Sequence, residues 1–262
     1  MDRLQRIVLL FVLLLVSFDE ADARRIVAPY KYGRVIIANY SAGAGLAPVV
    51  FDHWVHRAKY TCRICHVDIG FSMAQGDTKI TAATNKQGLY CGACHNGKRT
   101  YNDKTIFSSC SGTTPSQDPV CERCHSLKKS AEREQAFNAF VEKMPKNALG
   151  NGIDWEAAEN RGFIKPIDVL EGISVQRPPI KAQKDFSIEA NVTWVSDVIF
   201  SHKKHAFWNG CEVCHPEIFP IKKGSKRYTM LEIDSGAYCG VCHDKVAFPI
   251  LDCSRCHTRA KY

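Results

Sequence analysis

A short motif that can bind a metal cofactor recurs six times in this 262-residue sequence. Each copy has the form Cys-x-x-Cys-His, and together the copies use every cysteine except Cys110. Two thiols at this spacing can form thioethers with the two vinyl groups of one porphyrin, and the adjacent histidine can bind its iron. The motifs therefore predict six covalent hemes c. The predicted thioether cysteines are Cys62, Cys65, Cys91, Cys94, Cys121, Cys124, Cys211, Cys214, Cys239, Cys242, Cys253 and Cys256, and the predicted proximal histidines are His66, His95, His125, His215, His243 and His257.

Other uses of paired cysteines explain the pattern less well. Two Cys-x-x-Cys units can build a zinc site, and an exported chain with 13 cysteines would ordinarily suggest disulfides. Neither alternative accounts for the histidine that follows every second cysteine. We therefore favour hemes over zinc sites and over disulfides within the motifs.

The histidines outside the motifs form two matching pairs. His53 and His56 precede the first motif, and His202 and His205 precede the fourth at a constant offset of 149 residues. The chain has 10 histidines, so these four are the ones that the motifs leave over. Heme irons that are closed to substrates need a second axial ligand. We therefore expect these four histidines to be distal ligands, arranged in an internal repeat of two three-heme halves.

Two irons remain without a histidine in this count. Methionine is the next common axial ligand, and Met73 and Met230 each lie between the first two motifs of their own half. They are the candidates, with apolar packing as the alternative for either. The repeat aligns Met230 with Ala82 rather than with Met73, so the heme at His125 could be open. The alternatives for Cys110 are a loop thiol, an intermolecular disulfide or a ligand of that heme.

The N-terminus has the pattern of an export signal. Two arginines in residues 1–6 precede an apolar run over 7–18, and Ala21-Asp22-Ala23 has the form of a cleavage site. The run is too short to span a bilayer as a helix, although an uncleaved anchor is the alternative. We expect residues 1–23 to be a signal peptide and the mature chain to be periplasmic or extracellular. The net charge of +8 is scattered, and heme propionates would offset it, so no nucleic acid is expected.

The spacing of the motifs divides the mature chain into four parts. We expect an N-terminal extension at 24–50, a three-heme unit at 51–125, a partly helical insert at 126–199 and a second three-heme unit at 200–262. Each unit is small for its number of hemes, so porphyrins must supply much of its apolar core. The predicted fold is mostly irregular with small α-helices. In the insert, Phe137, Phe140, Val141 and Met144 predict one helix, and Asp154 predicts the N-cap of another.

The repeated segments resemble the triheme cytochrome c7 branch of the class III cytochromes c. The resemblance covers about half the chain and is carried in the second half by Phe200 to His205, Cys211 to His215, Gly236 to His243 and Ala247 to His257. It implies that His202 pairs with His215 and His205 with His243. It likewise implies pairs of His53 with His66 and of His56 with His95. It favours Met230 as the ligand of the heme at His257 and leaves the heme at His125 in doubt.

Closely packed hemes with two protein ligands are suited to electron transfer rather than to substrate chemistry. We expect an electron carrier or conduit, not an enzyme, that serves redox protein donors and acceptors, with a membrane-associated electron-transfer complex as one option. Anaerobic or metal-reducing respiration is suggested by family analogy alone. The alternative is a multiheme reductase that uses an open iron at His125.

Overall fold

The computed structural model describes residues 27–111, 119–177, 184–190 and 192–259. The predicted signal peptide at 1–23 lies outside the described residues. Within the described residues, no helix has the length and apolar character needed to cross a membrane.

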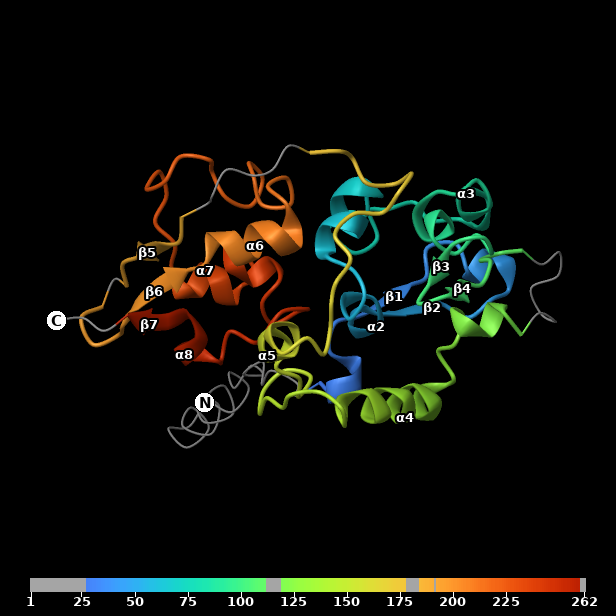
Figure 1. The fold of residues 1–262 in the computed structure, drawn as a ribbon, viewed down its shortest axis with the longest axis horizontal. Helices are drawn as coiled ribbons and strands as arrows, with labels where there is room; N and C mark the ends of the chain where they lie inside the picture. The colour runs from blue at the N-terminus through green and yellow to red at the C-terminus, as the bar shows by residue number, and fades with distance from the viewer. Residues whose placement is uncertain (1–26, 112–118, 178–183, 191, 260–262) are drawn as a thin grey trace, which may run out of the picture.

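The two heme-motif segments occupy opposite sides of the molecule, with the insert running between and beneath them (Figure 1). Regular elements are short and irregular backbone is extensive, which confirms the predicted fold class. The helices are α2 (His53–Arg57), α3 (Ala82–Lys86), α4 (Ser130–Val141), α5 (Trp155–Asn160), α6 (His202–Asn209), α7 (Met230–Asp234) and α8 (Cys253–Cys256). The 3-10 helices are η1 (Pro29–Lys31), η2 (Ala42–Ala44), η4 (Tyr90–Ala93), η5 (Cys121–Arg123) and η6 (Tyr238–Val241), and η3 (Ile64–Asp68) is a π-helical turn.

Short antiparallel strands accompany the helices, and the sequence did not predict them. They are β1 (Arg34–Ile37), β2 (Val49–Asp52), β3 (Thr100–Tyr101), β4 (Lys104–Thr105), β5 (Phe186–Ile188), β6 (Asp197–Phe200) and β7 (His257–Arg259). β1 pairs with β2, β3 with β4, and β5, β6 and β7 form a three-stranded sheet. Strands of two to four residues are too short for an alternating pattern to stand out in a sequence.

The internal repeat is also a repeat of structure. β2 leads directly into α2 in the first half, and β6 leads into α6 in the second. Further on, α3 precedes η4 just as α7 precedes η6. Thr81 and Thr229 cap α3 and α7 at their N-termini, and each forms a capping box with the residue three positions later. The repeat therefore places each pair of non-motif histidines, and each second motif, on equivalent elements.

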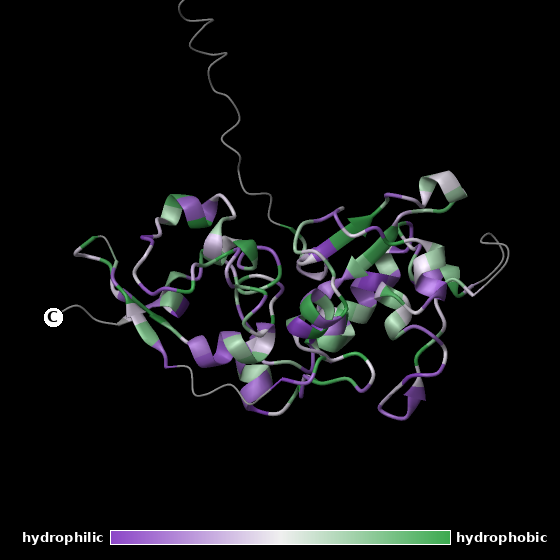
Figure 2. Ribbon diagram, turned by 90° about the horizontal axis from the view of Figure 1, so that it is seen from above, coloured by the Kyte–Doolittle hydropathy of each residue, from purple (hydrophilic) through white to green (hydrophobic). Residues whose placement is uncertain are grey.

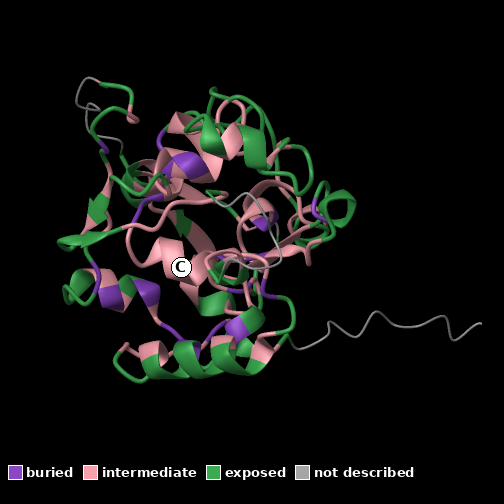
Figure 3. Cartoon of the chain, turned by 90° about the vertical axis from the view of Figure 1, so that its right-hand side faces the viewer, coloured by how far each residue is buried: buried purple, intermediate pink, exposed green. Residues whose placement is uncertain are grey.

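The main apolar cluster is built mostly from the insert, together with Tyr30 of the N-terminal extension, and contains no motif cysteine or histidine. Its buried members are Tyr30, Phe137, Ile153, Trp155, Ala158 and Ile164. Apolar and polar residues are interleaved through both motif segments (Figure 2), and buried stretches are few and separate (Figure 3). This is the distribution expected when a cofactor supplies the core of each motif segment.

Both predicted insert helices are present. α4 buries Phe137, which is 2% exposed, and ends at Val141, shortly before Pro145. Asp154 caps α5 by accepting a hydrogen bond from the backbone N–H of Ala157 at 3.0 Å. Phe137 also meets Trp54 of α2 edge to face, with ring centroids 5.3 Å apart. The insert thus packs directly against the helix that carries His53 and His56.

Candidate heme-binding sites

Four pairs of imidazole rings face one another across gaps of nearly constant width. A metal ion on the line between two imidazole nitrogens, about 2 Å from each, separates the ring centroids by roughly 6 Å. The observed separations are 6.5 Å for His53 and His66, 6.3 Å for His56 and His95, 6.3 Å for His202 and His215, and 6.4 Å for His205 and His243. The structure therefore brings together the four pairs that the resemblance implies.

One helical turn directs each non-motif pair to two different motifs. His53 and His56 lie three residues apart on α2, so they share one face of that helix. Phe51, at the end of β2, stacks on His56 with centroids 4.6 Å apart. Phe200 stacks on His205 in the same way at 4.4 Å. The phenylalanine that precedes each pair therefore orients the second imidazole, which explains its place in the repeat.

Backbone carbonyl groups fix the orientation of most of the imidazoles. Because a carbonyl only accepts, the Nδ1 atom that contacts it must carry the proton, which leaves the Nε2 lone pair free for a metal. For His56 and His95, the backbone carbonyls of Asp52 and Phe107 lie near enough to raise the imidazole pKa, but neither meets the geometry of a hydrogen bond to the buried Nδ1 atom. The Nδ1 atoms donate from His53 to Gly33 at 2.5 Å, His66 to Phe71 at 3.0 Å, His125 to Ala47 at 2.5 Å, His205 to Ser201 at 2.8 Å, His215 to Phe219 at 2.7 Å, His243 to Phe248 at 2.9 Å and His257 to Ser196 at 2.6 Å.

Burial keeps several of these imidazoles neutral. It lowers the pKa of His56 to about 3 and that of His243 to about 4, and the nearby partners His95 and His205 lower the two values further. Burial also lowers the pKa of His53. A neutral imidazole is the form that binds a metal ion. The environment therefore favours the protonation state that axial ligation needs.

None of the cysteines forms a disulfide. Burial raises the pKa of Cys65 and of Cys91 to about 12, with nearby thiols adding to the effect. Among the described residues, no group of histidine, cysteine and carboxylate side chains is arranged to hold a metal ion directly. Neutral thiols fit thioether formation.

Close backbone packing explains the glycine inside two of the motifs. A Cβ atom on Gly92 would lie 1.9 Å from the carbonyl oxygen of Asn85 in α3, and one on Gly240 would lie 2.0 Å from that of Ile233 in α7. No side chain fits at either position. The second motif of each half is thereby pressed against the helix before it.

The remaining two motif histidines have a different environment. Among the described residues, no imidazole faces His125 or His257. Met230 is the first residue of α7 and is 50% exposed, and Ala82 occupies the same place in α3. Met73 is 40% exposed and belongs to no helix. No observed contact joins either methionine to a motif histidine, so both remain predictions as ligands.

Cys110 lies beside the second and third motifs. The amide Nδ2 of Asn85 contacts its sulfur at 3.7 Å. Cys110 is close enough to Cys91 of the second motif and to Cys124 of the third for a thiolate at Cys110 to raise the pKa of both. It also has a positive φ of 55°. These contacts put Cys110 between two heme motifs without assigning it a ligand role.

Several residues that shape these sites gave no signal in the sequence. The carbonyl acceptors of Gly33, Ala47 and Ser196 lie in the N-terminal extension and the insert. Any residue type can supply a backbone carbonyl, so the sequence does not mark these acceptors. The one available signal was the repeat itself, because Ala47 and Ser196 are separated by the same 149 residues as the histidine pairs.

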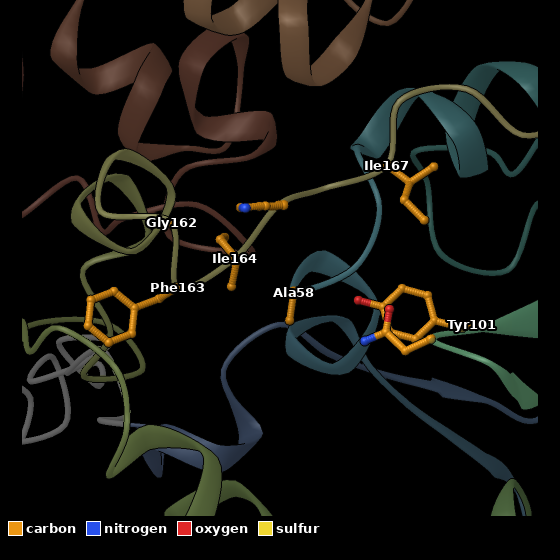
Figure 4. A pocket seen from close by; sticks show the side chains of 8 residues that line it. Ala58, Tyr101, Gly162, Phe163, Ile164 and Ile167 are labelled. Carbon is orange, nitrogen blue, oxygen red and sulfur yellow. The ribbon is translucent and has the colours of Figure 1, made fainter.

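One cavity in the described structure is separate from the motifs (Figure 4). Ala58 and Tyr101 line one side of it, and Phe163, Ile164 and Ile167 of the insert line the other. None of its lining residues is a cysteine or a histidine. It is a gap between the insert and the first motif segment and offers no redox chemistry.

A family model and several solved structures are similar to this chain. The family model described as cytochrome c7 and related cytochrome c matches residues 49–126 and 198–258. Four solved chains match. They include a c7-type three-heme cytochrome domain, 36% identical, covering 30% of this chain and 99% of its own, with a TM-score of 0.27. The C-terminal hexaheme fragment of GSU1996 is 24% identical and covers 86% of this chain and 97% of its own, with a TM-score of 0.26. The dodecaheme cytochrome c GSU1996 is 24% identical and covers 87% of this chain and 75% of its own, with a TM-score of 0.28. No curated protein matches.

The repeated motifs and the facing imidazoles define a multiheme c-type cytochrome whose cofactor is heme c. The family model covers more than half of the chain, in the two segments that carry all six motifs. The chain belongs to the family of cytochrome c7 and related cytochromes c.

Proposed function

We propose that this chain is a secreted hexaheme cytochrome that carries electrons between redox partners. The observation that supports it best is the set of four imidazole pairs whose centroids are 6.3 to 6.5 Å apart. A heme held between two imidazoles supplies one-electron chemistry at an iron that has no position for a substrate. We assign one heme to each Cys-x-x-Cys-His motif.

Each type of residue has a separate task in this proposal. The two cysteines of a motif tether the cofactor, and the following histidine binds the iron from one face. His53, His56, His202 and His205 bind four irons from the other face. The carbonyl groups that accept the Nδ1 protons hold the rings in place, so an iron can change its charge with little rearrangement of its ligands. Met230 is the proposed second ligand at His257, and Met73 is the candidate at His125.

The setting of the protein is also part of the proposal. The residues 1–23 have the composition of an export signal, and we place the mature chain in the periplasm or outside the cell. Its partners would be redox proteins, including a membrane-associated electron-transfer complex, in anaerobic or metal-reducing respiration. This last assignment rests on family analogy.

Holoprotein mass is the first test. The protein, expressed in a host that matures c-type cytochromes, is expected to carry six heme increments and a low-spin Soret spectrum. Replacing His56 with Ala should leave the number of heme increments unchanged, because the thioethers remain, while one heme should become high-spin. A colourless product, or a mass with fewer than six hemes, would contradict the proposal.

One observation favours a second candidate function. Ala82 stands where α7 has Met230, so the heme at His125 would lack the ligand that we propose for its counterpart at His257. An open iron there would suit a multiheme reductase. Electron paramagnetic resonance separates the two functions: six low-spin hemes support the carrier, whereas a high-spin signal that changes with nitrite or hydroxylamine supports the reductase.

A further inference from the structure

The side chain of Arg57 lies where the two motif segments and the insert meet. Arg57 is the last residue of α2 and directly follows His56. Its Nη1 atom donates a hydrogen bond to the carbonyl oxygen of Val246 at 2.6 Å. Its guanidinium also lies over the ring of Trp155, 4.6 Å from the centroid, and 5.6 Å from that of Trp208. Arg57 thus contacts all three parts of the chain.

The junction around Arg57 is closely packed. A Cβ atom on Gly210 would lie 2.7 Å from the Cδ atom of Arg63, so the residues beside the first and fourth motifs touch. Arg177 of the insert bridges the same two regions, with Nη1 2.9 Å from Asp68 and Nε 2.8 Å from Glu212. These contacts hold the two motif segments in a defined arrangement.

The charge of Arg57 is not neutralised by a carboxylate. Among the described residues, no acidic side chain lies within ion-pair distance of it. The carboxylate of Glu159 acts on it from further away and accepts a hydrogen bond from Nε1 of Trp208 at 2.9 Å. Burial lowers the pKa of Arg57, but a guanidinium stays charged in proteins. A cation enclosed by two indoles therefore lies at the junction without an acidic side chain as ion-pair partner.

The residues around Arg57 connect it to heme motifs in both motif segments. Arg57 lies one helical turn after His53, whose ring faces His66 of the first motif. Val246, whose carbonyl accepts from Arg57, donates its own N–H to the carbonyl of Cys242 in the fifth motif at 2.9 Å. The internal repeat places Ala206 at the position equivalent to Arg57, 149 residues later. The charge is therefore a feature of the junction and not of the repeated three-heme unit.

We propose that Arg57 raises the reduction potentials of the hemes at Cys62–Cys65 and Cys239–Cys242, so that electrons cross between the two halves at this pair. A ferric heme carries one more positive charge than a ferrous heme, so a nearby cation favours the reduced form. The step is a one-electron exchange in which one iron is oxidised from Fe(II) to Fe(III), the other is reduced, and no proton moves. This inference rests on the proposed function and adds the place where the halves are coupled.

The test is a heme-by-heme redox titration of the holoprotein, followed through the NMR signals of the heme methyl groups. Arg57→Gln keeps a donor for the Val246 carbonyl, and Arg57→Met keeps the apolar stem; both remove the charge. A unit charge about 10 Å away at an effective dielectric constant of about 20 changes an equilibrium by roughly tenfold. In both neutral variants we therefore expect the ratio of reduced to oxidised heme to fall about tenfold at the two junction hemes. For a one-electron couple this is a fall of about 59 mV in the reduction potential.

Two further variants serve as controls. Arg57→Lys retains the charge and should keep both potentials near those of the wild type. Arg161→Met removes an exposed arginine of the insert and should change no potential. The inference is overturned if the two neutral variants shift the junction hemes no more than Arg161→Met does. Loss of heme from both neutral variants would assign Arg57 a structural role and overturn it as well.

The result is separable from the proposed function. If the wild type holds six hemes and exchanges electrons with redox proteins while the neutral variants keep their potentials, the Arg57 inference alone fails. If the wild type exchanges electrons with no redox protein, the carrier function fails, whatever the variants do.

Discussion

The contact between the second motif of each half and the helix before it gives the sharpest structural prediction. Gly240→Ala would place a methyl group 2.0 Å from the carbonyl oxygen of Ile233, whereas ordinary contacts begin at 3.4 Å. The obstacle is backbone, and the capping box at Thr229 holds α7 in position. Helix α7 therefore has to move away from η6 or the motif has to distort. Overpacking of this kind costs about 1–3 kcal/mol.

The assay is thermal unfolding of the holoprotein, followed by circular dichroism. For a chain of this size, the melting temperature falls by roughly 2–4 °C for each kcal/mol lost. Gly92→Ala should behave like Gly240→Ala, because its methyl group would lie 1.9 Å from the carbonyl oxygen of Asn85. Gly43→Ala is the matched control, since nothing lies within 4 Å of its Cβ position and its φ is ordinary.

The outcome that refutes this reasoning is specific. If Gly240→Ala and Gly92→Ala both melt at the temperature of Gly43→Ala, the helices are not pressed against the motifs as described. A loss in one half only would show that the close approach is not a shared feature of the repeat.

Three further predictions concern the core, an ion-pair network and pH. Phe137→Ala should destabilise the protein by about 3–5 kcal/mol in denaturant unfolding, because Phe137 is 2% exposed and packs on Trp54; Leu127→Ala, at a side chain that is 48% exposed, should change little. Arg177→Gln should cost about 1–3 kcal/mol, because it leaves the fully buried carboxylate of Asp68 short of a charged donor; Lys226→Gln breaks an exposed pair, and equal losses in the two variants would contradict the prediction. The unfolded chain protonates His56 and His243 near 6.5, whereas in the folded chain burial, which lowers their pKa to about 3 and about 4, and the proposed bond to iron both keep the rings unprotonated, so unfolding takes up protons below pH 6.5. Stability should therefore be full above pH 6.5 and fall as the pH drops toward 4, and a flat profile in denaturant unfolding would contradict this.

The sequence predicted the parts of the site that residue type and spacing reveal. The six motifs, the two histidine pairs and the offset of 149 residues are visible in the printed chain. The capped helix at Asp154 and the helix that buries Phe137 were also predictable, because caps and helical periodicity are local signals.

Long-range contacts between segments were not predictable. The carbonyl of Val246 that meets Arg57 is 189 residues away in sequence, and a backbone acceptor looks the same at every position. The short strands depend in the same way on partners elsewhere in the chain, such as Val50 opposite Ile36. The second ligands at His125 and His257 stayed uncertain because methionine serves packing as readily as ligation.

The hydrogen bonds from His125 to Ala47 and from His257 to Ser196 have a consequence for how such chains grow. In each half, the histidine of the last motif donates a hydrogen bond to a residue that lies just before the first strand of that half. The beginning and the end of each half are therefore bonded to each other. Because these contacts lie within one half, a duplicated copy of the segment brings its own contacts and does not break those of its neighbours. Longer arrays of the same module then need only new linkers and new junctions, and a charge such as that of Arg57 can be added at one junction and omitted at the next.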